Sequence, residues 1–325
     1  MPFYSVAYGL RLRSSTELPG LVTATPDEHY DVDITLGSLS GFPTSHSSEV
    51  WFQSPERDSA NKPLITIDFL SETQSYHLKF NDGIEFIVDK TGTSVSGIWP
   101  DHMDLTDCVA NLTGPVLGFI LRLRGRSCLH ASCVLMNGQA IAIAGSQGAG
   151  KSTTAGMLNE LGYPAITDDI LVTEALVTGC QVTPGYPQLR LWPDSTRGIF
   201  GSTEALTRLT PDWDKRVLPL NTQYLPDKRT GYPLQAIFFL QPRQATLRPE
   251  IIRLRQKDTL LNLLANAYAA RILTNRMKTT DLKVFSGIAR QVAGYKLIPQ
   301  DKFTNLGRLC DSLIETVLLD KAESA

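Results

Sequence analysis

Short segments in which apolar and polar residues alternate make up most of the first hundred residues. The segments with the length and period of β-strands are FYSVAYGLRLRS, YDVDITLG, LITIDFL, SYHLKF, IEFIVD and SVSGIW. Prolines separate several of them, and Asn81, Asp82 and Gly83 predict a hairpin turn. The pattern therefore predicts a mostly antiparallel β domain over residues 1–103, without a catalytic constellation of its own.

A helical period replaces this alternation at Asp104. Apolar residues recur at helical spacing over residues 104–126, where Gly114 and Pro115 are expected to kink or divide the helix. This helix is interpreted as a connector to a second domain over residues 127–320, which a disordered tail over 321–325 follows. No apolar run reaches the length that a membrane-spanning helix needs.

A strand, a glycine-rich turn and a helix are predicted in succession from Ala140. The small apolar run Ala140–Ala144 is typical of a buried strand, and it ends at Gly145. The sequence GSQGAGKS then matches the eight positions of the phosphate-binding P-loop pattern. A helix is expected over Ser152–Leu161, with Gly162 as its C-terminal stop.

The residue types of this turn suit a polyphosphate. Glycines let successive backbone N–H groups converge on phosphate oxygens, Lys151 can reach the terminal phosphates, and the Ser152 hydroxyl suits Mg²⁺. The residues expected to hold a nucleotide are Gly145, Ser146, Gln147, Gly148, Ala149, Gly150, Lys151, Ser152 and Thr153. The alternative is a glycine-rich connection between a strand and a helix that binds no ligand.

Two adjacent carboxylates, Asp168 and Asp169, interrupt the next apolar run, PAITDDILV. Neighbouring side chains of a strand point to opposite faces, so both acids could reach a nucleotide only at a strand end or a bend. One carboxylate would then hold Mg²⁺, while the other would accept a proton from a substrate hydroxyl. A solvated turn, or a cap for the next element, is the alternative.

His130 lies upstream of the P-loop. It begins a segment that is expected to form a strand, a turn at Asn137 and Gly138, and then the P-loop strand. A hairpin of this kind returns the chain on itself, so His130 could lie near the carboxylates or the terminal phosphate. A histidine with a purely structural role is the alternative.

Turn-forming residues fill the tract VTPGYPQLRLWPDSTRGIFG, which predicts a long rigid loop. A cation that offsets charge on the migrating phosphoryl group assists phosphoryl transfer. The cations available in and after this tract are Arg190, Arg197, Lys215, Arg216, Lys228 and Arg229. Arg190 and Lys215 are the favoured phosphate or substrate contacts, because apolar residues close to each of them in the sequence should fix their positions.

The segments LHASCV, GSQGAGKS and TDDI, at these intervals, resemble the catalytic core of the HPr kinase/phosphorylase family, including the HPr-kinase-like proteins of lasso-peptide biosynthesis. The resemblance implies an α/β P-loop core akin to phosphoenolpyruvate carboxykinase and ATP-dependent phosphorylation of a serine hydroxyl. It also implies that Asp168 accepts the proton, that Asp169 belongs with His130 and the metal, and that Ser152 is the other metal ligand. His130 and Lys151 match the remaining catalytic positions.

The opening stretch FYSVAYGLRLRSSTELPGL resembles the N-terminus of the HPr-kinase-like subgroup. There the implied substrate is a serine near the C-terminus of a ribosomally made precursor peptide. Thr153 stands where the family usually has Glu, and the C-terminal signatures of HPr recognition and of the reverse phosphorylase reaction are not recognisable. The resemblance therefore implies a precursor peptide, not HPr, as the acceptor. Members of the HPr kinase family assemble as oligomers. The resemblance therefore includes a homo-oligomer among the possible states of this chain.

Composition adds limits to this picture. The chain has 325 residues, of which 42% are hydrophobic and 20% charged, as in an ordinary soluble protein of two domains. A net charge of −2 gives no electrostatic case for binding nucleic acid or a membrane. The five cysteines show no CxxC or Cys/His zinc spacing, which favours reduced thiols and a cytoplasmic protein without a signal peptide.

These observations predict an ATP- and Mg²⁺-dependent kinase that phosphorylates a serine of a peptide or protein, with the C-terminal serine of a lasso-type precursor as the best candidate. One alternative is a nucleotide-binding regulatory protein without transferase activity. The other is a kinase of a small hydroxyl-bearing molecule.

Overall fold

The chain forms two compact units, residues 1–126 and 127–325. The computed structural model describes residues 1–26, 29–37, 42, 48–211, 213–224, 231–246, 248–300 and 305–323. The helical residues 104–126, predicted as a connector, are part of the first unit. No helix in these ranges is both long enough and apolar enough to cross a membrane.

A nine-stranded sheet forms most of the first unit, in the order β3-β1-β2-β4-β9-β8-β7-β6-β5. Its strands are β1 (Phe3–Ala7), β2 (Leu10–Ser14), β3 (Val22–Thr23), β4 (Val32–Leu36), β5 (Ser48–Gln53), β6 (Ile65–Leu70), β7 (Ser75–Phe80), β8 (Glu85–Asp89) and β9 (Ser94–Ile98). Within this described sheet, β4 pairs in parallel with β2 and β9, and the other neighbours are antiparallel. Burial alternates along β2 and β8, as a strand period of two requires.

The helix of the first unit is divided at the predicted place. α1 (Leu105–Asn111) passes into a wide π-helical turn, η1 (Leu112–Val116), and then into α2 (Leu117–Leu123). Pro115 lies in the wide turn, because it has no N–H to donate to an α-helical bond. The predicted division at Gly114 and Pro115 is therefore confirmed.

A larger mixed sheet forms the centre of the second unit, in the order β10-β14-β15-β19-β12-β11-β13, with β21 paired to β19 and β20 paired to β21. Its strands are β10 (Ser127–Leu129), β11 (Ala131–Met136), β12 (Gln139–Ala144), β13 (Ala165–Thr167), β14 (Leu171–Ala175), β15 (Cys180–Thr183), β19 (Tyr232–Leu240), β20 (Glu250–Arg253) and β21 (Ala293–Ile298). A separate small sheet contains β16 (Gln188–Leu191), β18 (Arg216–Pro219) and β17 (Thr207–Arg208), in that order.

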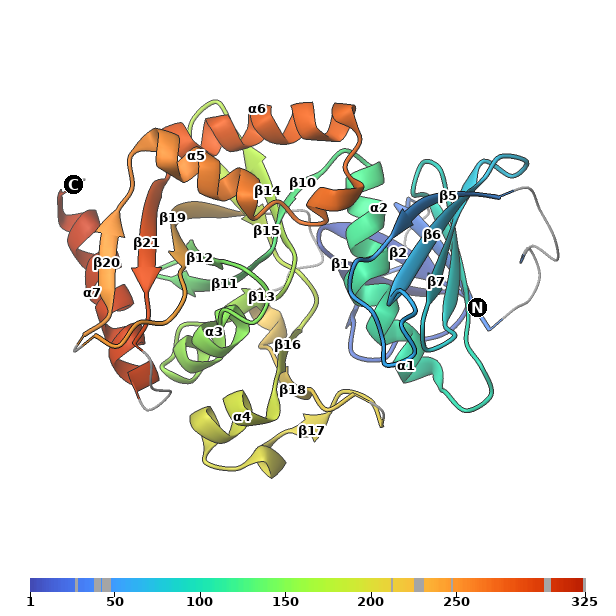
Figure 1. Ribbon diagram of the computed structural model, residues 1–325, viewed down its shortest axis with the longest axis horizontal. Coiled ribbons are helices and arrows are strands. Elements are labelled where there is room, and N and C mark those ends of the chain that lie inside the picture. The colour runs from blue at the N-terminus through green and yellow to red at the C-terminus, as the bar shows by residue number, and fades with distance from the viewer. Residues whose placement is uncertain are drawn as a thin grey trace. The chain divides into compact units, whose positions relative to one another are not determined.

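Helices pack against the central sheet and against one another in this unit. They are α3 (Lys151–Glu160), α4 (Pro193–Phe200), α5 (Gln256–Ala265), α6 (Asn275–Gln291) and α7 (Leu306–Glu323). In Figure 1, α5 and α6 lie above the strands of this sheet, whereas α3 and α4 lie below them. This unit is thus a mixed α/β structure, as predicted.

Two sequence predictions are wrong here. The tract predicted as a long rigid loop contains β16 and α4, because Pro193 occupies the first turn of a helix, where its missing N–H costs nothing. The disordered tail predicted over 321–325 is wrong for residues 321–323, which continue α7. Extending a helix adds one hydrogen bond per residue fixed, and Lys, Ala and Glu are good helix formers. Residues 324 and 325 lie outside the described ranges.

The hairpin of β11 and β12 places the P-loop at one edge of the sheet. Asn137 and Gly138 both have positive φ, at 52° and 75°, which is the requirement of a tight two-residue hairpin turn. β12 then runs parallel to β19, and β19 runs parallel to β21. The carboxyl ends of these parallel strands meet at the same edge, which is where open α/β sheets bind ligands.

Candidate functional site

The P-loop has the strand–loop–helix context that its sequence predicts. β12 ends at Ala144, and α3 begins at Lys151. Gly148 and Gly150 have φ values of 77° and 106°, in the left-handed region that favours glycine. A Cβ on Gly145 would lie 3.1 Å from the Cβ and the carbonyl oxygen of Leu240, so this position also needs glycine.

The N-terminus of α3 is open to an anion. Its N-cap is Gly150, which has no side chain to accept a bond from the N–H groups of the first turn. The Lys151 ammonium bends back over the loop and donates to the carbonyl oxygens of Gly145 and Ser146, at 3.0 and 2.9 Å. Burial lowers the pKa of Lys151, and the nearby carboxylates oppose that effect.

Asp168 is fully buried directly after β13. Its Oδ1 accepts hydrogen bonds from the hydroxyls of Ser132 and Ser152, at 2.6 and 2.9 Å. Its Oδ2 accepts one from the backbone N–H of Arg190 at 3.1 Å. Burial raises the pKa of Asp168, and the charge of Asp169 raises it further. The carboxylate thus joins the P-loop serine, β11 and β16.

The Asp169 side chain lines the pocket beside the P-loop, in a different direction from that of Asp168, because the chain makes a sharp bend at this residue. Its φ is 60°, and the Ile170 N–H donates to the Asp168 carbonyl at 2.6 Å, which closes a three-residue turn. The sequence left open how adjacent strand residues could serve one site, and this bend is the answer. The Asp169 side chain is 37% exposed, and its Oδ1 lies 3.6 Å from Nε2 of His130.

Opposing effects act on the pKa of Asp169. Burial alone raises it, but the interaction with His130 and the positive charges of Lys215 and Arg190 outweigh burial and lower the pKa below its ordinary value. His130 itself lies between β10 and β11, where its N–H donates to the Asn266 carbonyl at 2.8 Å. The backbone therefore holds His130 beside Asp169, as predicted from the hairpin.

The small sheet carries two further cations of the site. Arg190 belongs to β16, is 5% exposed, and places its guanidinium 4.8 Å from the centre of the Tyr186 ring. Lys215 precedes β18, with its ammonium 5.3 Å from the centre of the Trp192 indole. Arg190 and Lys215 are the two cations that the sequence favoured. Lys228 and Arg229 lie outside the described residues.

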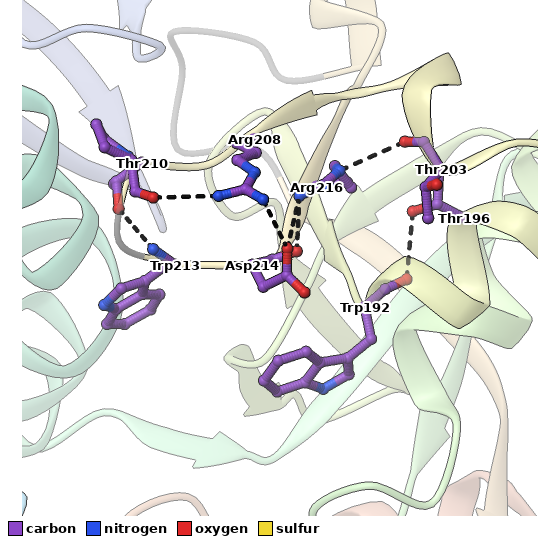
Figure 2. Close-up of polar contacts among 9 residues, drawn as sticks. Trp192, Thr196, Thr203, Arg208, Thr210, Trp213, Asp214 and Arg216 are labelled. Atoms are coloured by element: carbon purple, nitrogen blue, oxygen red, sulfur yellow. Dashed lines mark hydrogen bonds and ion pairs between the residues drawn. The ribbon is translucent and has the colours of Figure 1, made fainter.

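A polar network fixes the turn that carries Lys215 (Figure 2). The buried Arg216 donates to the Asp214 carbonyl and carboxylate, at 2.9 and 3.2 Å, and to the Thr203 carbonyl at 3.4 Å. The exposed Arg208 lies 3.5 Å from the same Asp214 carboxylate. In Figure 2 the Trp192 indole lies apart from this network, below Asp214.

These side chains surround a pocket of about 300 Å³. The predicted residues that line it are His130, Gln147, Gly148, Gly150, Lys151, Ser152, Thr153, Asp169, Arg190 and Lys215. Gly145, Ser146 and Ala149 belong to the loop but not to the pocket wall, and Asp168 contacts the wall through Ser152. The structure therefore brings the sequence-predicted residues together around one cavity.

Trp192, Asp194, Ser195 and Arg243 also line the pocket and were missed in the sequence. Arg243 follows β19, the parallel neighbour of β12, so the rule that ligands bind at the carboxyl ends of strands could have indicated it. The Ser195 hydroxyl lies 2.7 Å from that of Thr153. Nothing in the sequence signals that contact, because it joins α4 to α3.

The oxygen atoms beside the P-loop fit a hard divalent cation. The Ser152 hydroxyl and the Asp168 carboxylate are 2.9 Å apart, and Mg²⁺ prefers such oxygen donors. Among the described residues no group of three or more His, Cys, Asp or Glu side chains is arranged to hold a metal. Mg²⁺ is often bound by one or two protein ligands together with phosphate oxygens and water, so a pair of donors suffices.

Comparison with known proteins gives a distant likeness to solved structures. No protein-family model and no curated protein matches the chain. Among solved structures, the HPr(Ser) kinase/phosphatase from Coxiella burnetii aligns with 61% of this chain and 93% of its own length, at 11% identity and a TM-score of 0.34.

Proposed function

We propose that this chain is an ATP- and Mg²⁺-dependent kinase that transfers the γ-phosphoryl group to a serine hydroxyl of a peptide or protein. The observation that carries the proposal is the bend at Asp169. It turns one carboxylate into the P-loop pocket, while the preceding one, Asp168, bonds the P-loop serine. A pocket that only bound nucleotide would have no need of a second, pocket-facing acid.

The P-loop would hold the phosphates. The free N–H groups at the start of α3 and the backbone of residues 145–150 supply donors, and the macrodipole of the helix favours an anion there. Lys151 now bonds loop carbonyls and would exchange one of them for a phosphate oxygen. Lys and Arg exceed Asp on the pocket wall by four residues to two, so the cavity attracts anions.

Ser152 and Asp168 would hold Mg²⁺, which offsets charge on the phosphates when bound. This assignment reverses the sequence prediction, which gave the metal to Asp169 and the proton to Asp168. The geometry favours the reversal, because Asp168 is fully buried and accepts the Ser152 hydroxyl, whereas Asp169 lines the pocket. Asp168 is therefore connected to the pocket through Ser152, whereas the Asp169 carboxylate can contact a substrate hydroxyl directly.

Asp169 would then act on the acceptor. Its lowered pKa keeps it ionised at neutral pH, so it can orient a serine hydroxyl by accepting its hydrogen bond. The serine oxygen forms a bond to the γ-phosphorus while the bond from that phosphorus to the β–γ bridging oxygen breaks, leaving ADP, and the hydroxyl proton passes to Asp169. His130 positions Asp169, and Arg190 and Lys215 offset the charge that develops on the phosphoryl group.

The acceptor is inferred from the sequence motifs. The spacing of LHASCV, GSQGAGKS and TDDI resembles that of serine kinases, and the N-terminal stretch resembles relatives that act on lasso-type precursor peptides. We therefore propose the C-terminal serine of such a precursor as the substrate. The 300 Å³ pocket beside Asp169 has space for one small side chain next to the phosphates.

The test is a transfer assay with the full chain, ATP, Mg²⁺ and serine-ended precursor peptides, read by mass spectrometry. We expect a peptide heavier by one phosphoryl group, and a peptide with alanine in place of the serine should stay unmodified. Asp169→Asn should lower the transfer rate about 1000-fold with little change in nucleotide affinity. Asp194→Asn is the matched control, because Asp194 lines the same pocket but is paired with Arg197 and exposed.

Two results would contradict the proposal. Tight ATP binding without any phosphorylated product would leave a nucleotide-binding regulatory protein. Full activity of Asp169→Asn would show that the pocket-facing carboxylate is not the proton acceptor.

A further inference from the structure

A second cavity adjoins the phosphate pocket on the far side of the P-loop. This crevice lies between Ala149 and Gly150 of the loop, Leu240 at the end of β19, and Leu306 and Leu309 of α7. The crevice and the pocket share parts of their walls, namely Gly150, Thr153 and Arg243. One elongated ligand could therefore occupy both.

The walls of the crevice suit a flat aromatic group. Leu240, Pro299, Leu306 and Leu309 give it apolar sides. Arg243 lies at the junction with the pocket, where its NH2 group is 3.9 Å from the position of a Cβ on Gly150. Apolar sides with a planar guanidinium at one end are well matched to a nucleobase. The crevice encloses only about 20 Å³ without ligand, so a base has to spread its walls on binding.

Gln300 supplies a specific polar contact in this crevice. Its side chain is more than nine-tenths buried, and its Nε2 donates to the Thr246 carbonyl at 3.1 Å. That bond fixes the orientation of the amide, because only the nitrogen can donate. The remaining atom, Oε1, has no hydrogen-bond partner among the described residues. A buried acceptor without a donor is unfavourable, so a ligand that supplies an N–H would gain from this site.

We propose that the crevice holds the adenine of ATP and that Oε1 of Gln300 accepts a hydrogen bond from its 6-amino group. This proposal rests on the proposed function, since it requires a nucleotide whose phosphates lie in the P-loop. The 6-oxo group of guanine or hypoxanthine would set an acceptor against Oε1 and be repelled. Cytosine has an amino group, but its single ring covers less of the apolar walls.

The experiment measures binding of tripolyphosphate, ATP, ITP and CTP to the full chain by calorimetry in Mg²⁺. ATP and ITP differ on one edge of the base, where the 6-amino group and unprotonated N1 of adenine are replaced by an oxo group and an N1–H, so their ratio reports contacts to that edge. We expect ATP to bind about tenfold more tightly than ITP, and CTP to bind more weakly than ATP. This comparison needs no variant and so does not depend on the folding of one.

A variant pair assigns the preference to Gln300. Gln300→Met keeps the length of the side chain but removes Oε1, and it should bring the affinity for ATP down to that for ITP without changing tripolyphosphate binding. The matched control is Gln244→Met, an exposed neighbour whose variant should keep the ATP preference.

The outcomes separate this proposal from the proposed function. If tripolyphosphate binds but ATP and ITP bind equally, or CTP equals ATP, the adenine site is wrong and the phosphate site stands. A Gln300→Met variant that still prefers ATP would also overturn it. If neither tripolyphosphate nor any nucleotide binds, the proposed function fails and the adenine site fails with it.

Discussion

The two units of the chain use charged side chains in different ways. In the first unit, several charged side chains pair between neighbouring strands. Arg13 of β2 makes a two-pronged bond to Asp33 of β4, at 2.8 and 2.7 Å, and His77 of β7 lies 2.6 Å from Glu85 of β8. These pairs are partly exposed and join strands. Such pairs each contribute little to stability.

In the second unit, charges converge on a cavity instead. Lys151, Arg190 and Lys215 face the pocket with Asp169, while Asp168 is buried behind Ser152. The two acids are adjacent, and each of the three cations comes from a different segment. The pKa values of both acids and of Lys151 are shifted. The difference indicates that paired charges in this chain serve the fold, whereas converging charges serve a ligand.

The strongest test of this comparison removes one charge from each unit. Lys151→Ala should lower the rate of phosphoryl transfer about 1000-fold, because it removes the P-loop cation that would contact the terminal phosphates. Lys90→Ala is the matched control, since Lys90 is exposed in the first unit and bonds only Gln74 among the described residues. Transfer assays on both variants check the prediction. Equal losses would mean that the units do not differ in this respect.

A second test separates activity from stability at Asp168. Asp168→Asn should lower the transfer rate about 100-fold, because the amide is a poor metal ligand. The folded-state pKa of Asp168 is raised, so its ionised form costs stability once the pH rises above the ordinary carboxyl value of 3.8. The neutral amide avoids that cost, so the variant should be at least as stable as the wild-type chain at neutral pH. In acid the wild-type carboxyl is itself neutral, so the substitution should not increase the free energy of unfolding there. Urea unfolding at both pH values measures this, and a large loss of stability would instead assign Asp168 a structural role.

Much of the site could be predicted from the sequence because its residues fall in short segments of clear pattern. Gly145, Lys151 and Ser152 follow a strand and open a helix, and that local context fixes their positions. The turn at Asn137 and Gly138 likewise predicted the hairpin that places His130 near the carboxylates. Local patterns of this kind predict the structure well because they are flanked by regular strands and helices.

The rest depends on geometry that residue types do not encode. The roles of Asp168 and Asp169 turn on one backbone angle, the positive φ of Asp169, which no pattern in PAITDDILV signals. Arg243 and Gln300 come from distant segments that the parallel strands bring together. The helix α6 was not predicted, because most of its residues are polar and only a narrow stripe around Phe285 and Ile288 is buried.

A third test asks whether the small sheet positions Lys215. Lys215→Ala should lower the transfer rate about tenfold, because it removes one of several cations near the phosphoryl group. Arg216→Ala should lower the transfer rate by less than Lys215→Ala does. Arg216 acts on Lys215 indirectly, because it fixes the turn before β18 (Figure 2). Arg208→Ala is the matched control, because Arg208 contacts the same Asp214 from an exposed position. If Arg216→Ala lowers the rate but Lys215→Ala does not, the network acts on something other than Lys215.

The smallest effect is expected from the paired charges of the first unit. The hydrogen bond from His77 lowers the pKa of Glu85 below its ordinary value of 4.5. A carboxyl with a lowered folded-state pKa contributes stability above pH 4.5 and loses that contribution as the pH falls through the folded-state pKa. Since both side chains are partly exposed, the contribution should be about 0.5 kcal/mol. Glu85→Gln should therefore flatten the acid limb of the unfolding free energy slightly and leave phosphoryl transfer at neutral pH unchanged. A change in transfer rate would show that the first unit contributes to catalysis through its charges, which is the opposite of what the pairing of these charges between strands indicates.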